Sequence, residues 1–285
     1  MRRLLLLIIA LATLLPSLAF GYDVLVLQSR RDPAHEEVLK GFHNGSKPSE
    51  RVIVLSDYAE VDVIRIVRED RPSLILAIGD AALNATRPVR QTPVVSVMAL
   101  GIHTVSANRT NVSGIGVYAD PNKYLKMFKT MNTRRVGVVY NAAKSGWYMQ
   151  QARKAAAAAG IELVVREVSS PKESIDKLAS LAGKIDILWM LPDSTAVSRE
   201  NAEAYFRFGQ LNSVPVVSFT SSYLGLGAAA VIDIDRPAIG RQAAVMAEQL
   251  LNGSDTTPVA FPDIVKPVTN QTVLKRLNIS LDAQK

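Results

Sequence analysis

The sequence of 285 residues contains no cysteine. This absence excludes disulfide bonds, cysteine nucleophiles and thiolate metal sites. It also excludes the cysteine that a lipoprotein carries at its cleavage site, so we expect a protein without a covalent lipid anchor. The stability of the fold must then come from the burial of apolar side chains.

Catalytic motifs are also missing. The three histidines, His35, His43 and His103, share no short motif. The chain has no H-E-x-x-H zinc motif, no G-x-S-x-G nucleophile motif and no G-x-x-x-x-G-K-[ST] phosphate loop. Residues 114–119 and 225–230 match a loose dinucleotide-binding pattern, but neither has a strand before it and a helix opening within it. We therefore predict no enzymatic activity, no metal site and no cofactor.

No apolar run is expected to span a membrane. Residues 4–15 are apolar and follow Arg2 and Arg3, but this run is well short of the roughly 20 residues that a spanning helix needs. A charged start, a short apolar run and small residues after it are typical of a secretory signal peptide. We predict a signal peptide over residues 1–21, cleaved near Ala19 or Gly21, and an exported mature protein.

The formal net charge is +7. A basic chain is a candidate for nucleic-acid binding when its lysines and arginines gather on one face. Here they are scattered, mostly beside acidic residues, without an arginine-rich run or a basic stripe interleaved with aromatics. We therefore predict that nucleic acid is not a partner.

The pattern that is present is an alternation of short apolar runs with helical segments. Residues 74–78 and 185–191 are almost wholly apolar, as in strands of a parallel sheet that is covered on both faces. Each run ends in a turn that contains an aspartate, Asp80 or Asp193, and a helix is predicted to follow. Ligands in open α/β sheets bind beyond the carboxyl ends of the strands. The sequence therefore predicts an α/β protein with two similar lobes.

Between these runs the pattern predicts further boundaries. The less regular stretch 100–116 is expected to be the first crossing between the lobes. Residues 141–146 are expected to form a loop, and residues 148–159, 196–211 and 235–251 to form helices. The last of these helices begins with Asp235 as an N-cap and Pro237 in its first turn.

In their order and spacing, several segments resemble a known family. They are residues 37–42, 76–82, 111–114, 135–141, 191–195 and 239–243. They resemble the substrate-binding proteins of ABC transporters that have the type I periplasmic binding protein fold, in the family that includes the tryptophan-binding lipoprotein-like proteins. The resemblance covers nearly all of the predicted mature chain.

The resemblance implies two doubly wound parallel-sheet lobes joined by three crossings. Residues 22–117 plus 222–256 would form the first lobe, and residues 118–221 plus 257–285 would form the second. The helix over residues 235–251 would return to the first lobe. A small ligand would bind in the cleft between the lobes, and a hinge motion would close the cleft on it.

The loops after the strands supply the predicted ligand-binding residues. They are Gln28, Ser29, Gly79, Asp80, Ala81 and Met98 in the first lobe, and Asn141, Ser145, Asp193, Ser194, Thr195, Phe219 and Thr220 in the second. Helix N-termini at Ala81 and at Ser194 or Thr195 would suit a ligand carboxylate. Asp193 or Asp80 would receive an ammonium group, so the ligand is predicted to be an amino acid or a similar zwitterion, with an aromatic one among the candidates.

Each of these assignments has an alternative. Asp80 and Asp193 are equally suited to capping a helix. Many relatives have a small uncharged residue at the position of Asp80. The additional acidic group in this chain would favour a cationic or amine-bearing ligand. Trp147 would either stack on an aromatic ligand or pack within its lobe, and Trp189 is expected in the core.

We therefore predict a monomeric, periplasmic solute-binding component of an ABC importer, with a membrane permease as its partner. The alternative is a periplasmic sensing module with the same site, which would present its closed form to a membrane receptor or a sensor kinase. A repressor of this fold is not expected, because the signal sequence occupies the end where a DNA-binding headpiece would lie.

Overall fold

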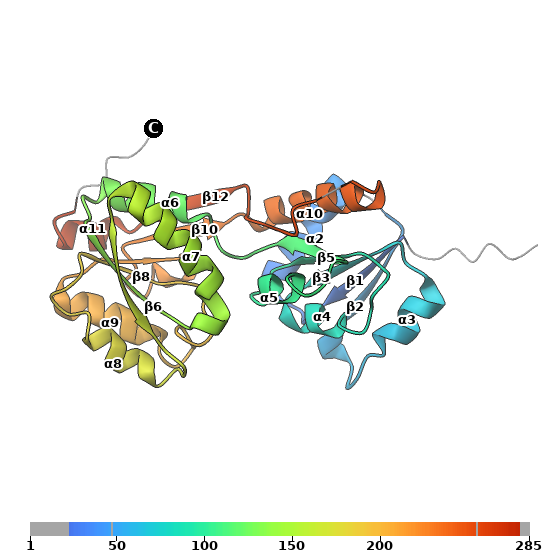
Figure 1. The fold of residues 1–285 in the computed structure, drawn as a ribbon, viewed down its shortest axis with the longest axis horizontal. Helices are drawn as coiled ribbons and strands as arrows, with labels where there is room; N and C mark the ends of the chain where they lie inside the picture. Colours follow the sequence, from blue (N-terminus) through green and yellow to red (C-terminus); the bar gives the residue numbers. More distant parts are fainter. Residues whose placement is uncertain (1–22, 47, 255, 280–285) are drawn as a thin grey trace, which may run out of the picture.

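The computed structural model describes residues 23–46, 48–254 and 256–279. The predicted signal peptide and its cleavage site lie outside these residues. Figure 1 shows two lobes, each a sheet covered by helices. Within the described residues, no helix combines the length and the apolar character that crossing a membrane requires.

The first lobe contains a six-stranded parallel sheet in the order β11-β5-β4-β3-β1-β2. Its strands are β1 (Val24–Gln28), β2 (Glu50–Val54), β3 (Leu74–Ile78), β4 (Val94–Val97), β5 (Val112–Ile115) and β11 (Val259–Ala260). Its helices are α2 (Pro33–Gly45), η1 (Leu55–Asp57), α3 (Val63–Asp70), α4 (Asp80–Ala85), α5 (Ile102–Ser106) and α10 (Arg236–Leu251). All residues of β1 and β3 are buried, as expected for strands covered on both faces.

The second lobe contains a six-stranded sheet in the order β12-β10-β9-β8-β6-β7. Its strands are β6 (Arg135–Tyr140), β7 (Glu162–Glu167), β8 (Ile187–Trp189), β9 (Val216–Ser218), β10 (Ala230–Ile234) and β12 (Val265–Thr269). Its helices are α6 (Pro121–Thr130), α7 (Ala142–Ala159), α8 (Glu173–Ala179), α9 (Ala202–Asn212), η2 (Ser221–Tyr223) and α11 (Gln271–Arg276). Strand β12 is antiparallel to β10 and lies at the edge of the sheet. Pro267 has no N–H group and is tolerated in this edge strand.

The prediction of two α/β lobes joined by three crossings is confirmed. The chain passes between the sheets after β5, between β10 and α10, and between β11 and β12. The lobe boundaries differ from the predicted ones, because β10 pairs with β9 and so extends the second sheet, whereas β11 pairs with β5 in the first. Residues 222–234 therefore belong to the second lobe, and residues 257–260 to the first.

Helix α10 returns to the first lobe, as predicted, and there it packs along α2 (Figure 1). The two helices approach so closely that a side chain on Gly240 would overlap the Val38 carbonyl oxygen, and one on Gly41 would overlap the Pro237 carbonyl oxygen. Only glycine permits this backbone contact. The contact fixes the start of α10, which includes Arg236, to the first lobe.

Three predicted elements differ from the structure. The stretch 100–116 is not a crossing, because it contains α5 and the inner strand β5. Residues 142–146 form the first turns of α7, since the Asn141 side chain caps the helix at the Lys144 N–H. Helix α9 begins at Ala202 and not at residue 196, and residues 194–201 form turns.

Candidate functional site

A pocket of about 380 Å³ lies between the two lobes. It is lined from both sides of the gap, by residues that include Asp80, Arg87, Leu100, Tyr118, Lys144, Pro192 and Ser194. A larger hollow of about 880 Å³ lies between α8 and α9, but residues of the second lobe alone line it. The inter-lobe pocket is therefore the one that a closure of the lobes would enclose, and it contains the predicted Asp80 and Ser194.

Asp193 is a buried structural carboxylate with four hydrogen-bond donors. The N–H groups of Thr195 and Ala196 donate to its Oδ1, each at 2.9 Å. The Asn141 N–H donates to its Oδ2 at 2.8 Å, and the Ser145 hydroxyl donates to the same oxygen. These bonds tie the loop after β8 to the first turn of α7. Asp193 thus holds the pocket wall together and has no unbonded oxygen to offer an ammonium group.

Asp80 also bonds to the backbone of its own lobe. Its Oδ1 accepts from the Gly101 N–H at 2.8 Å, and its Oδ2 accepts from the Leu100 N–H at 3.2 Å. The loop after β4 is thereby held against the start of α4. Ala81 is exposed beside Asp80, and Met98 is half-buried at the end of β4 with a φ of +56°. Asp80 remains partly exposed in the pocket.

The predicted residues after β1 and β3 support one another. Gln28 is buried, and its side-chain amide donates to Glu36 Oε1 at 2.9 Å. The Ser29 hydroxyl oxygen accepts from the Ala82 N–H at 2.9 Å, which satisfies one donor of the first turn of α4. Gly79 has a φ of +90°, and a side chain there would lie 2.6 Å from the Ser29 hydroxyl. These residues shape the carboxyl edge of the first sheet.

The predicted residues after β9 begin a compact turn. The Phe219 ring meets the Tyr223 ring edge-on, with centroids 5.5 Å apart. The hydroxyl oxygens of Thr220 and Ser222 are 3.0 Å apart. This turn, η2, lies beside β10 in the second lobe.

The predicted helix N-terminus at Ser194 or Thr195 is absent, because α9 begins at Ala202. The N–H group of Thr195 is already bonded to Asp193. The structure therefore provides no helical site for a ligand carboxylate at this position.

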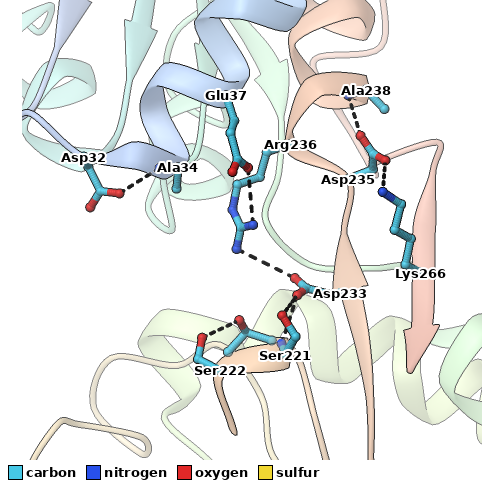
Figure 2. Close-up of polar contacts among 11 residues, drawn as sticks. Asp32, Ala34, Glu37, Ser221, Ser222, Asp233, Asp235, Arg236, Ala238 and Lys266 are labelled. Atoms are coloured by element: carbon cyan, nitrogen blue, oxygen red, sulfur yellow. Dashed lines mark hydrogen bonds and ion pairs between the residues drawn. The ribbon is translucent and has the colours of Figure 1, made fainter. Parts of the chain in front are cut away.

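Sequence reasoning missed a charged network at the second crossing, which Figure 2 shows. Asp233, on β10, is 7% exposed, and its Oδ2 accepts from the Ser221 N–H at 2.9 Å and the Ser221 hydroxyl at 2.5 Å. Arg236, at the start of α10, lies 3.8 Å from Asp233 Oδ1 and 3.5 Å from Glu37 Oε2. Both separations are longer than a hydrogen bond. An aspartate inside an otherwise apolar strand was the one signal for this network.

Two buried atoms of this network have no hydrogen-bond partner among the described residues. They are Asp233 Oδ1 and Arg236 Nε. A buried polar atom without a partner is unfavourable, and more so when it carries charge. The second crossing is therefore the place in the inter-lobe region where charged atoms have unused bonding capacity.

An aromatic cluster connects the lobes near the first and third crossings. The His103 ring, from α5, stacks on the Trp147 ring, from α7, with centroids 3.3 Å apart. Tyr118 and Phe261, from the two crossings, also contact Trp147. Burial lowers the pKa of His103 to about 4. Trp147 thus packs within the protein between the lobes, and Trp189 is fully buried in the core as expected.

Comparisons with known proteins agree with this architecture. The family model described as ABC transporter substrate binding protein matches residues 34–284. A tyrosine-binding protein of Clostridioides difficile (strain R20291) is 28% identical over 223 residues, which cover 74% of this chain and 64% of that protein. The chain thus spans less than two thirds of the length of this curated relative.

Solved structures with low sequence identity share the fold. A ligand-free, open substrate-binding protein with adhesive properties from Clostridium difficile is 22% identical, with a TM-score of 0.70 over 93% of this chain and 97% of that chain. A Streptococcus pneumonia ABC domain in complex with L-Trp is 18% identical, with a TM-score of 0.66 over 92% and 96%. A conserved domain protein from Vibrio cholerae is 20% identical, with a TM-score of 0.63 over 91% and 95%. The predicted fold is confirmed by these matches.

Proposed function

Because the chain belongs to the family of ABC transporter substrate-binding proteins, we propose that it captures a small solute between its lobes and delivers it to the permease of an ABC importer. In this proposal the mature protein is exported, acts without covalent chemistry and works as a monomer. Closure of the two lobes about the three crossings would signal the loaded state to the permease.

The observation that carries this proposal is the position of the inter-lobe pocket. Residues from both lobes line it, and the Tyr118 ring from the first crossing is part of its wall. A ligand there would contact both lobes at once and would therefore favour their approach. A ligand can shift such an equilibrium only through contacts that differ between the open and closed states.

The ligand class that we propose is an α-amino acid, with aromatic ones first. The curated relative is named for tyrosine, and one solved neighbour is a complex with L-Trp. In this chain the proposed contacts are the residues named above after β1, β3, β4, β6, β8 and β9, except Asp193, whose two oxygens are already bonded within the second lobe. Of these residues, Asp80 and Ser194 lie in the pocket wall, and Tyr118 from the first crossing lies there with them.

A thermal-shift screen of residues 22–285 tests the proposal. The panel would contain the amino acids, with L-tyrosine and L-tryptophan among them, together with polyamines, nucleosides and sugars. A ligand that binds only the folded state adds about 2.7 kcal/mol of stability at a hundredfold excess over Kd. We expect the melting temperature to rise with one or a few amino acids and to stay constant with the other classes.

Small-angle scattering with the same ligand then tests closure. We expect the radius of gyration to fall when the amino acid is added. A shift with sugars or nucleosides alone would contradict the ligand class, and binding without any compaction would contradict hinge closure.

A further inference from the structure

Three aspartates lie where the lobes face each other, and they differ in unused bonding capacity. Asp193 takes four donors, and each oxygen of Asp80 takes one backbone N–H. In Asp233, Oδ2 takes two donors from Ser221, and Oδ1 takes none. Asp233 is therefore the buried carboxylate that has an oxygen free for a further donor.

Arg236 provides the complementary charge. Its guanidinium lies between two carboxylates, 3.8 Å from Asp233 and 3.5 Å from Glu37, and its Nε has no partner among the residues described. A guanidinium prefers two parallel bonds to one carboxylate at about 2.7–2.9 Å. Arg236 forms no such pair, so its guanidinium can still form two short bonds to a ligand carboxylate.

The two charges belong to different lobes. Asp233 is part of the second sheet through β10, whereas Arg236 is fixed to the first lobe by the close contact of α10 with α2. Figure 2 shows Arg236 reaching from α10 toward Asp233, with Glu37 beside it. A ligand that bonds to both residues would therefore bridge the lobes.

We propose that Asp233 and Arg236 bind the charged head group of a zwitterionic ligand. The ligand ammonium group donates to Asp233 Oδ1, and the ligand carboxylate accepts from the Arg236 guanidinium. The ligand thus replaces one long ion pair with two short ones, and the total charge of the site is unchanged. This inference rests on the proposed function, and it assigns the recognition of the amino-acid head group to residues other than Asp80 and Asp193.

Ligand analogues test it in wild-type protein. Isothermal titration calorimetry would compare L-tyrosine with tyramine, which lacks the carboxylate, and with N-acetyl-L-tyrosine, which lacks the ammonium charge. If the screen identifies L-tryptophan, its tryptamine and N-acetyl counterparts are used. A charged hydrogen bond to a buried partner predicts that each analogue binds roughly 10- to 100-fold more weakly than the amino acid.

Two variants connect each analogue to one residue. In Arg236→Gln, the affinities for L-tyrosine and tyramine should converge, because the guanidinium that binds the ligand carboxylate is gone. In Asp233→Asn, the affinities for L-tyrosine and N-acetyl-L-tyrosine should converge, because the carboxylate that binds the ammonium group is gone. If a residue has only a structural role, its substitution should lower the affinity for all three ligands by the same factor.

Each of the two variants has a matched control in the same part of the chain. Asp235→Asn makes the same substitution at the same crossing, where the carboxylate caps α10 and pairs with Lys266 at 2.6 Å. Arg241→Gln removes an exposed arginine from the same helix. Both control variants should bind the three ligands with wild-type ratios.

The outcomes separate the two proposals. If wild-type protein binds no amino acid, the proposed function fails and the head-group site fails with it. If wild-type protein binds an amino acid but the variants keep the wild-type ratios between analogues, the head-group site alone is overturned. Convergence in both variants, with unchanged ratios in both controls, supports the site.

Discussion

Asp193 and Asp233 are the same residue type, lie in the same lobe and are both nearly inaccessible to solvent. They differ in the number of hydrogen-bond donors around them. Asp193 is 1% exposed and receives four donors, all from its own lobe. Asp233 is 7% exposed and has one oxygen without a hydrogen bond among the described residues. Burial therefore does not distinguish the two roles, whereas the number of donors does.

The difference has a physical basis. A buried carboxylate loses its hydration, and it is stable as an anion only when nearby donors replace the lost water. At Asp193 three backbone N–H groups and the Ser145 hydroxyl supply the donors, so the charge stabilises the fold. At Asp233 only half of the carboxylate is supplied, and the nearest cation stands 3.8 Å away. A ligand with an ammonium group would complete the second site but has no place at the first.

The largest expected effect comes from Asp193→Ala. The substitution leaves three backbone N–H groups without their acceptor, and the Ser145 hydroxyl keeps only the Asn141 carbonyl oxygen at 3.3 Å. Each unsatisfied buried donor costs about 1–3 kcal/mol. We expect the free energy of unfolding to fall by about 3 kcal/mol or more, measured by urea denaturation.

Asp193→Asn is the graded control for this prediction. Its amide keeps one acceptor oxygen for the donors of Thr195 and Ala196 but presents an NH₂ group toward Asn141 and Ser145. The loss of stability should lie between zero and that of the alanine variant. A stability unchanged in the alanine variant, combined with lost ligand binding, would mean that Asp193 is a ligand contact and would remove the contrast with Asp233.

The contrast between these aspartates shows what the sequence can and cannot predict. The apolar runs at residues 74–78 and 185–191 predicted buried parallel strands, because a sheet covered on both faces leaves no position for polar residues. They also predicted Asp80 and Asp193 at the carboxyl edge of the sheets. Whether such an aspartate has spare bonding capacity depends on donors about twenty to fifty residues away in the chain, such as Gly101 and Asn141, which no local pattern contains.

The errors in the predicted fold also come from contacts that are distant in the chain. The stretch that contains β5 was assigned to a crossing because its glycines are typical of loops. In the structure Gly114 lies within the sheet, where a side chain would overlap the Ser96 carbonyl oxygen of β4. The second crossing was misplaced because η2 and its polar residues read as a link between lobes. In the structure Ser221 bonds to Asp233, which keeps that segment within the second lobe.

An intermediate effect is expected from His103, a half-buried polar group between the lobes. Its Nε2 has no hydrogen-bond partner among the described residues, but the ring is neutral because burial lowers its pKa from 6.5 to about 4. The unfolded chain therefore binds the proton more tightly than the folded protein does. Stability is complete above about pH 6.5 and falls as the pH is lowered toward 4.

Allowing for the part of the ring that solvent reaches, we expect a loss on the order of 1–2 kcal/mol across this range. Urea denaturation at several pH values measures it, and His103→Gln is the control. The variant should have a shallower pH dependence than the wild type between pH 6.5 and 4, although it loses the stack on Trp147. An equal pH dependence in the wild type and the variant would show that the His103 ring is not desolvated, and His103 would then not belong in the comparison with the two aspartates.

The smallest effect is expected from Asp233→Asn in the absence of ligand. The substitution removes a buried charge that has bonds on one oxygen only, while the amide oxygen still accepts from Ser221. Replacing a poorly paired buried charge with a neutral group is often neutral or stabilising. We expect the free energy of unfolding to change by less than about 1 kcal/mol, in contrast to the large loss at Asp193. A loss as large as that of Asp193→Ala would mean that Arg236 already satisfies Asp233 in the free protein, and the argument for a ligand ammonium group at that oxygen would then have no basis.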